Sequence, residues 1–217
     1  MNNFSLELRD NCLIIRFAEP MKILSWAPFN GGLTQSDCIF NWQNDKFGSG
    51  DLQTLFKEKV RQVEIPPHSV GMITAAEIKN FKEAESNRGP LKVHSIVTVG
   101  LDNTRTVGDR ADVEPGEGCN KHSGTINLIV ICNALPDLQG QAEAVQVATM
   151  AKTKALMDAG VLSKKSGNPA TGTGTDCIVI AASGEIKENY CGMHTSLGQL
   201  IGETVYQSIS QGISISL

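Results

Sequence analysis

The chain has 217 residues, of which 41% are apolar and 19% charged, and its formal net charge is −4. This profile is typical of a globular protein and excludes collagen-like, coiled-coil and disordered chains. The longest basic run is Lys164-Lys165, so no electrostatic footprint for nucleic acid or an anionic membrane is present. No apolar run is long enough to span a bilayer, and charges interrupt the N-terminal segment, so we expect a cytoplasmic protein.

The first part of the chain predicts an antiparallel set of strands followed by a helix. Strand patterns cover 5–9, 12–17, 21–26 and 38–42, with a turn at Asp10-Asn11 and a break at Pro20. The segment 51–62 has the caps and the period of a helix, and Pro66-Pro67 follows it.

The rest of the chain predicts central strands, two helices and a hairpin. Short β-branched runs at 70–74, 93–99 and 125–132 predict buried strands, and 105–123 predicts a long surface loop. The clearest helix pattern covers 137–160, with Gly160 as the C′ residue that ends it and Lys152 on its apolar stripe. A strand at 177–182, a turn at Ser183-Gly184 and a returning strand to about 190 predict a hairpin before a final helix at 196–210, capped by Thr195.

Because strands outnumber helices and include hairpins, the pattern favours an α+β fold. We expect a mixed, largely antiparallel sheet packed against helices, sandwich-like, in a single domain spanning 1–217. The sequence leaves the oligomeric state open, and a homo-oligomer is compatible with it.

The richest local signal is Thr171-Gly172-Thr173-Gly174-Thr175-Asp176, which enters a buried strand. Alternating glycines let backbone N–H groups converge on an anion or an oxyanion, the hydroxyls add donors, and Asp176 adds a charge. The segment lacks the Gly-Lys-Ser/Thr of a phosphate-binding loop. The alternative is a plain turn with self-satisfying hydroxyls.

His194 stands just before the last helix and is the second candidate. A neutral imidazole there suits a general base near pH 7, while a surface or capping histidine is the alternative. The predicted hairpin would return the chain to the end of the sheet where Asp176 begins, which brings the two side chains within reach.

Other polar segments carry weaker signals. Two segments stand at strand ends, Asn30-Gly31-Gly32 and the segment ending at Asn103. Their amide groups can hydrogen-bond to an amide substrate, or the segments form plain turns. The six cysteines are scattered without a C-x-x-C pair and are interpreted as buried hydrophobes. Cys119 and His122 lack metal-ligand spacing.

Several segments together resemble the adenosylcobinamide amidohydrolase family. The most specific are Ala170-Thr-Gly-Thr-Gly-Thr-Asp176 and His194-Thr-Ser-Leu-Gly-Gln-Leu-Ile-Gly202. The others occur in family order at 23–32, 97–103 with Gly108-Asp109, 124–130 and 151–156.

The resemblance implies a corrinoid substrate. The expected reaction is hydrolysis of the amide that joins the aminopropanol arm to the corrin ring of adenosylcobinamide, giving adenosylcobyric acid. Together with the local signals it gives catalytic candidates, which are His194, Asp176, Thr173 and Thr175. The substrate-binding candidates are Asn30, Gly31, Gly32, Asn103, Asn127, Lys152, Thr171, Gly172 and Gly174.

Three chemical routes stay open at this point. His194, oriented by Asp176, activates water while the 171–175 backbone stabilises the oxyanion, and Lys152 meets Asp176 or a substrate carbonyl. A threonine nucleophile at Thr173 or Thr175 is the second route, and a divalent metal on Asp176 and His194 is the third. A non-catalytic corrinoid-binding module and an amidohydrolase of another small amide are the alternatives for function.

Overall fold

The first half of the chain builds three antiparallel strands and one parallel strand. The computed structural model describes residues 4–44, 51–113 and 124–216. Strands β1 (Phe4–Arg9), β2 (Cys12–Ser25) and β3 (Gly32–Gln43) pair antiparallel in chain order. Helix α1 (Leu52–Gln62) then carries the chain to β4 (Val70–Thr74), which lies parallel to β3. Asp51 caps α1 by accepting from the backbone N–H groups of the first turn, as the sequence predicts.

The second half repeats this order of pairings. After the short 3₁₀ helix η1 (Ile78–Asn80), strands β5 (Lys82–Arg88), β6 (Leu91–Val99) and β8 (Ile126–Pro136) pair antiparallel. Helix α2 (Leu138–Asp158) leads to β10 (Cys177–Glu188), parallel to β8. Two short strands, β7 (Thr104–Arg105) and β9 (Gly172–Thr173), form a separate ribbon, and α3 (Ser196–Ser216) follows β10. Each parallel pair is therefore joined by a helical crossover, the connection that parallel strands require.

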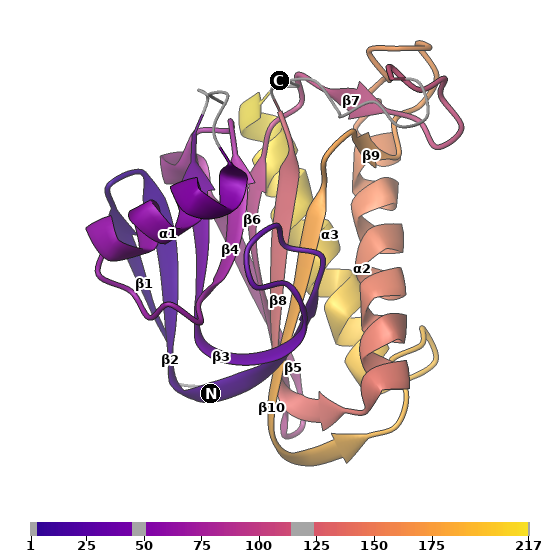
Figure 1. The fold of residues 1–217 in the computed structure, drawn as a ribbon. Helices are drawn as coiled ribbons and strands as arrows, with labels where there is room; N and C mark the ends of the chain where they lie inside the picture. Colours follow the sequence, from indigo (N-terminus) through magenta and orange to yellow (C-terminus); the bar gives the residue numbers. More distant parts are fainter. Residues whose placement is uncertain (1–3, 45–50, 114–123, 217) are drawn as a thin grey trace.

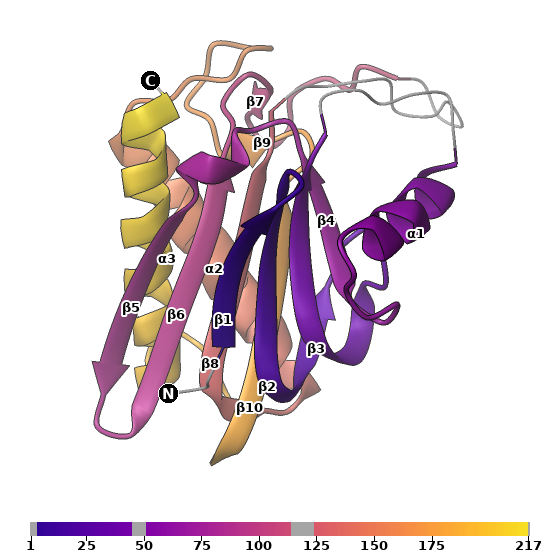
Figure 2. The ribbon, with the colours of Figure 1, turned by 90° about the vertical axis from the view of Figure 1, so that its left-hand side faces the viewer.

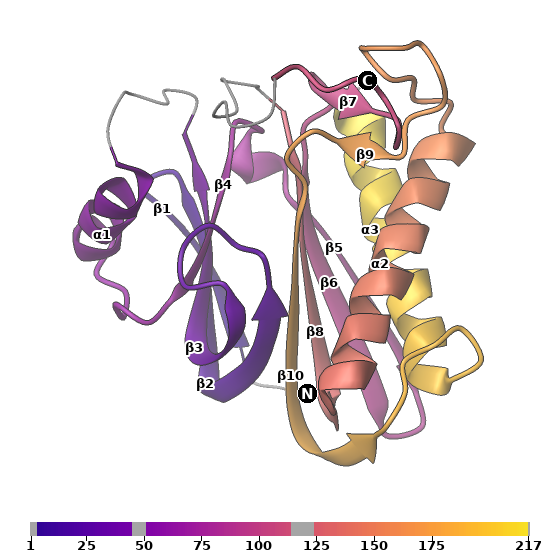
Figure 3. The same ribbon diagram turned by 45° about the vertical axis from the view of Figure 1, so that its right-hand side comes forward.

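The eight-stranded sheet is folded over on itself. Its order is β4-β3-β2-β10-β8-β6-β5, with β1 paired to β2. The β2–β3 pairing shifts register between Arg16 and Met21, around the Pro20 break that the sequence predicts. Only the last part of β2, from Lys22 to Ser25, pairs with β10. The two parts of the sheet consequently face each other, as Figure 3 shows.

Three apolar layers hold this arrangement. One lies between α1 and the β2–β4 part of the sheet around Phe40 and Phe56, and a second between the two parts of the sheet around Ile15 and Ile129. The third lies between the β10–β5 part and helices α2 and α3. Figures 1 and 2 show α1 on one side of the molecule and the two long helices on the other. The expected α+β class, with a mixed sheet packed against helices, is confirmed.

The predicted hairpin at 177–190 is wrong. β10 is one strand, and its register against β8 shifts between Ala182 and Ile186 before pairing continues to Glu188. Gly184, at φ +108°, takes up the extra residues within that strand. A Ser-Gly pair that the sequence marks as a turn is a bulge here, because β8 supplies a pairing partner on both sides of it.

The predicted helix ends at Gly160 and Thr195 are confirmed, and so is the predicted burial of the described cysteines. Gly160 adopts φ +67° just beyond α2, and Thr195 Oγ1 accepts from Gly198 N at the start of α3. The five described cysteines, Cys12, Cys38, Cys132, Cys177 and Cys191, are buried. Residues 114–123 of the predicted loop, with Cys119 and His122, lie outside the described residues.

Among the helices of the described ranges, none combines the length and the apolarity that a membrane crossing needs.

Candidate active site

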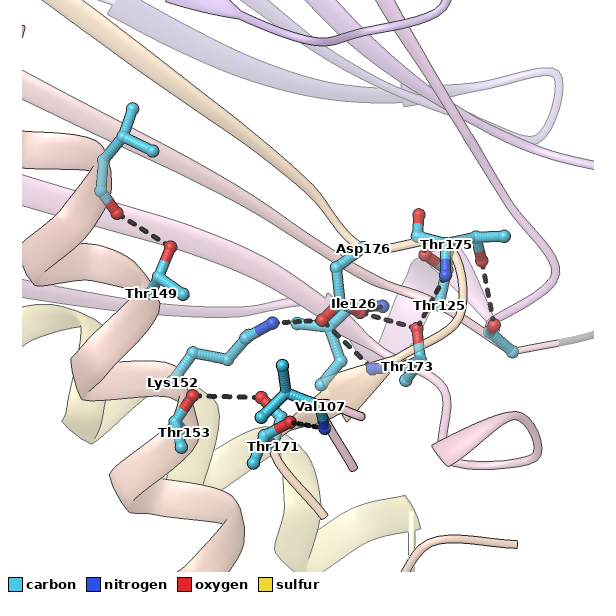
Figure 4. Close-up of polar contacts among 12 residues, drawn as sticks. Val107, Thr125, Ile126, Thr149, Lys152, Thr153, Thr171, Thr173, Thr175 and Asp176 are labelled. Atoms are coloured by element: carbon cyan, nitrogen blue, oxygen red, sulfur yellow. Dashed lines mark hydrogen bonds and ion pairs between the residues drawn. The ribbon is translucent and has the colours of Figure 1, made fainter. Parts of the chain in front are cut away.

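The candidate site lies at the edge of the sheet where β8 and β10 begin. There the Asp176 carboxylate accepts four hydrogen bonds (Figure 4). Oδ1 accepts from Thr173 Oγ1 at 2.6 Å and from Ile126 N at 3.1 Å. Oδ2 accepts from Thr173 N at 3.1 Å and from Lys152 Nζ. A carboxylate has about four lone-pair directions, so the acceptor capacity of Asp176 is filled and its orientation is fixed.

Lys152 reaches Asp176 from α2. Its side chain is 7% exposed and that of Asp176 is 10% exposed, so the ion pair is almost fully removed from water. The predicted contact between Lys152 and Asp176 is confirmed. It explains why a charged residue stands among the alanines that α2 packs against β10: a buried ammonium needs a paired carboxylate.

The alternating glycines of the threonine-rich loop make room for polar side chains. A methyl group at Gly172 would overlap the Asp176 carboxylate and lie 2.7 Å from Lys152 Nζ. A methyl group at Gly174 would lie 2.7 Å from Asn103 Nδ2. The glycines therefore allow the ion pair and the Asn103 amide to pack directly against the loop backbone.

The backbone N–H groups of this loop do not converge on an open position, contrary to expectation. Thr171 N donates to Arg105 O at 2.9 Å, and Gly174 N donates to Asn103 O at 3.0 Å. Thr173 N already donates to Asp176. Backbone carbonyl groups at the ribbon of β7 and β9 accept from Thr171 and Gly174, and the Asp176 carboxylate accepts from Thr173, which sequence spacing alone does not reveal. The expected oxyanion role of the 171–175 backbone is thus not available at these three positions.

Two cavities meet at Asp176. The larger, of about 770 Å³, is lined by residues of α2, the β7 segment and the threonine-rich loop, including Lys152 and the candidates Thr171, Gly172, Thr173, Gly174 and Thr175. The smaller, of about 260 Å³, opens between the two parts of the sheet and is lined in part by Asn127. Trp26, Thr175 and Asp176 line both cavities. Trp26 is 50% exposed, and its indole Nε1 donates to the Asp176 carbonyl oxygen at 2.7 Å.

His194 does not belong to this site, so the predicted pairing with Asp176 is wrong. β10 runs from Asp176 across the sheet for 12 residues, roughly 40 Å of extended chain. At its far end Cys191 N donates to Glu143 near the start of α2, whereas Lys152 stands nine residues further along that helix. His194 lies beyond this far end, because the predicted hairpin is a single strand.

No metal ligand set is formed by the predicted residues. Asp176 and His194 lie at opposite ends of β10. Within the described ranges there is no group of three or more histidine, cysteine, aspartate or glutamate side chains placed to hold a metal ion.

The first-loop candidates have structural contacts. Asn30 Nδ2 donates to the carbonyl oxygens of Pro67 and Ser69, each at 2.9 Å, and so ties this loop to the start of β4. Gly31 packs against the Ala27 backbone, and Gly32 begins β3 with φ +95°. None of the three lines either cavity at Asp176. Asn103 lies beneath Gly174 and supports the loop.

The nucleophile candidates at the site differ in their surroundings. Thr173 Oγ1 donates to the Asp176 carboxylate, while Thr175 Oγ1 donates to the Gly124 carbonyl oxygen at 3.4 Å. Burial, and after it the charge of Asp176, raises the pKa of the Cys177 thiol to about 12. The Cys177 thiolate is therefore negligible near neutral pH. Thr173 is the hydroxyl with an adjacent base.

Sequence reasoning missed Trp26 and Arg105 as lining residues. Trp26 stands in the 23–32 segment on which the family resemblance rests, and that was the available signal. Its exposure depends on how the first loop meets β10, which no local pattern indicates.

The fold is a mixed α+β fold. Its candidate site holds the buried Lys152–Asp176 ion pair and the Thr173 hydroxyl, which donates to Asp176, and all three residues line the larger cavity. A hydroxyl next to a carboxylate base, with an ammonium group beside them, suits hydrolysis of an acyl bond. The comparisons with known proteins narrow the class. The model of the adenosylcobinamide amidohydrolase family matches residues 2–216, and the chain belongs to this family.

Individual relatives are distant. An adenosylcobinamide amidohydrolase of Methanosarcina mazei is 25% identical over 197 residues, which cover 86% of this chain and 87% of the relative. An uncharacterized protein of Methanocaldococcus jannaschii is 36% identical over 91 residues, 42% of this chain, and the match spans 36% of that relative's length. Among solved structures, the PH0078 protein of Pyrococcus horikoshii is 9% identical with a TM-score of 0.45, covering 97% of this chain and 83% of that one.

Proposed function

We propose that this chain hydrolyses the amide between the corrin side chain and the aminopropanol arm of adenosylcobinamide. The products are adenosylcobyric acid, which can re-enter coenzyme synthesis, and 1-amino-2-propanol. Membership of the family supports the amidohydrolase class and a corrinoid substrate. The observation that carries the proposal is the buried Asp176 carboxylate, which joins Lys152 to the Thr173 hydroxyl on a cavity of about 770 Å³.

Thr173 is the proposed nucleophile. Its hydroxyl donates to Asp176 Oδ1 at 2.6 Å, a short charge-assisted contact that places a base next to the attacking oxygen. As the Thr173 oxygen attacks the amide carbonyl, its proton passes to Asp176 and then to the departing amine nitrogen. The C–N bond breaks, an ester remains on Thr173, and water hydrolyses it to the free acid and the threonine hydroxyl.

Lys152 is the proposed donor to the oxyanion. An ammonium carries three N–H donors, and in the described part of the chain Asp176 is its one charged partner. Because Lys152 lines the same cavity as Thr173, we propose that one of its other N–H groups donates to the developing negative oxygen. This role replaces the one expected of the loop backbone, whose N–H groups at Thr171, Thr173 and Gly174 already have protein acceptors.

The test is incubation of the purified protein with adenosylcobinamide, followed by mass spectrometry of both products. Thr173→Ala should abolish product formation, whereas Thr173→Ser keeps the hydroxyl and should retain part of the rate. Rapid quenching of the wild type should also reveal Thr173 carrying the corrinoid acyl group. Full activity of Thr173→Ala would refute the covalent route. Corrinoid binding without release of 1-amino-2-propanol would refute the hydrolytic function and favour a binding module.

A further inference from the structure

The smaller cavity contains a buried acceptor that the site described so far does not use. Asn127, on β8, is 2% exposed and lines this cavity. Its amide Nδ2 donates to Asn41 Oδ1 at 2.8 Å and to the Ile73 carbonyl oxygen at 2.9 Å. Its carbonyl oxygen, Oδ1, is buried and has no hydrogen-bond partner among the described residues. A buried polar atom left unpaired destabilises the folded protein, so its retention needs an explanation.

The hydrogen bonds of Asn127 Nδ2 to Asn41 and Ile73 fix the orientation of the Asn127 amide. Asn41 Nδ2 donates to Thr98 Oγ1 at 2.9 Å, which leaves Asn41 Oδ1 as the acceptor for Asn127. The Ile73 backbone carbonyl oxygen can only accept, so Asn127 must present its NH₂ group to Ile73 and Asn41. Because both of its donors are engaged there, the carbonyl oxygen is the atom of this amide that has no partner among the described residues.

Other polar side chains of the small cavity are already engaged. Thr125 Oγ1 donates to the Thr175 carbonyl oxygen at 2.7 Å, and Thr175 Oγ1 donates to Gly124 O. Thr74 Oγ1 accepts from Ala76 N at 3.0 Å. Within the described lining, Asn127 Oδ1 is thus the side-chain acceptor without a partner, and a complementary ligand must bring an O–H or N–H donor.

Size separates the two cavities. A volume of about 260 Å³ lies below the roughly 300–1,000 Å³ of sites that enclose drug-sized ligands, so it suits a small arm and not a macrocycle. The larger cavity, of about 770 Å³, lies on the other side of Trp26, Thr175 and Asp176. A substrate bound across this boundary would place its scissile bond next to Asp176.

We propose that the small cavity is the leaving-group subsite, in which Asn127 Oδ1 accepts a hydrogen bond from the hydroxyl of the amino alcohol. The inference rests on the proposed function and adds a specificity-determining residue to it. Asn41 and Thr98 are positioning residues, since they hold the Asn127 amide in its orientation without lining the cavity.

The experiment compares two substrates that differ in one hydroxyl. One is adenosylcobinamide and the other is its analogue with a propylamine arm. The wild type should prefer the hydroxyl-bearing arm by about 10- to 100-fold in kcat/KM, because the arm without a hydroxyl leaves Asn127 Oδ1 unpaired. Asn127→Leu should bring this ratio close to one by slowing adenosylcobinamide, with the propylamine analogue unaffected or faster. Thr98→Val, which removes the acceptor of Asn41, should lower the ratio in part.

Product inhibition gives a test that needs no variant. On the wild type, 1-amino-2-propanol should inhibit at lower concentration than propylamine. Equal inhibition by the two amines, equal turnover of the two substrates by the wild type, or an unchanged ratio in Asn127→Leu would overturn the subsite. Release of neither amine from either substrate would instead refute the proposed function, and the subsite with it.

Discussion

Replacing Asp176 with asparagine probes the buried ion pair most directly. Asparagine keeps the size of the side chain but offers one acceptor oxygen and two N–H donors. All four groups around Asp176 donate to it, and two of them are the backbone N–H groups of Ile126 and Thr173. In either amide orientation an NH₂ group therefore faces a backbone N–H, and Lys152 loses its charged partner.

The expected cost is large because both side chains are at most 10% exposed. Breaking a buried pair by removing one partner typically costs about 3–5 kcal/mol, and Asp176→Asn should fall in that range. Lys152→Met should cost less, about 1–3 kcal/mol, because Asp176 keeps its hydrogen bonds from Thr173 and Ile126. The double variant should be less destabilised than the sum of the two, since its buried ammonium is gone as well.

Urea unfolding followed by circular dichroism and tryptophan fluorescence measures these differences, provided that the slope of the transition stays constant among the variants. Lys154→Met is the matched control, because Lys154 pairs with Asp158 on the exposed face of the same helix and its loss should leave the midpoint unchanged. The reasoning fails if Asp176→Asn lies within about 1 kcal/mol of the wild type, or if Lys152→Met costs more than Asp176→Asn.

Three further predictions address other parts of the chain. His194→Ala should leave the turnover of adenosylcobinamide unchanged, since His194 lies beyond the far end of β10; a large loss of rate would restore it as a candidate. Gly172→Ala should lower turnover by at least about 100-fold in a folded protein, because the methyl group displaces Lys152, and a normal rate would contradict this. The hydrogen bond from Ser163 holds the pKa of Asp109 at about 2, below its ordinary value of 3.8. This stabilisation is present above the ordinary value and is lost as the pH falls through the folded-state value, so the urea midpoint of the wild type should drop more steeply than that of Asp109→Asn between about pH 4 and pH 2. Parallel curves would show that the Asp109 contacts do not contribute.

Local pattern was enough to predict most helices and strands and to identify the polar loop 171–176 as a candidate site. Helix 137–160, its terminal glycine and the cap at Thr195 depend on residues that are close in sequence, and the structure confirms them. Lys152 was also identifiable, because a lysine on an apolar helical stripe needs a charged partner and Asp176 was the nearby carboxylate in the polar loop.

Strand pairing, by contrast, was outside the reach of local pattern. Ser183-Gly184 has the composition of a turn, and whether it turns or bulges depends on β8, about 50 residues earlier in the chain. That one difference moves His194 to the opposite end of the sheet from Asp176. The small cavity likewise depends on Asn41, Ile73 and Asn127 meeting from three strands across the folded sheet.

The sequence by itself determined the fold class, the family and the polar loop that carries Thr173 and Asp176, because these depend on residue types and short-range periodicity. Only the tertiary structure decided which residues share a cavity. Strand register and the folding of the sheet bring together side chains that are far apart along the chain, and hydrogen bonding in the ribbon of β7 and β9 determines which polar groups stay free for a substrate.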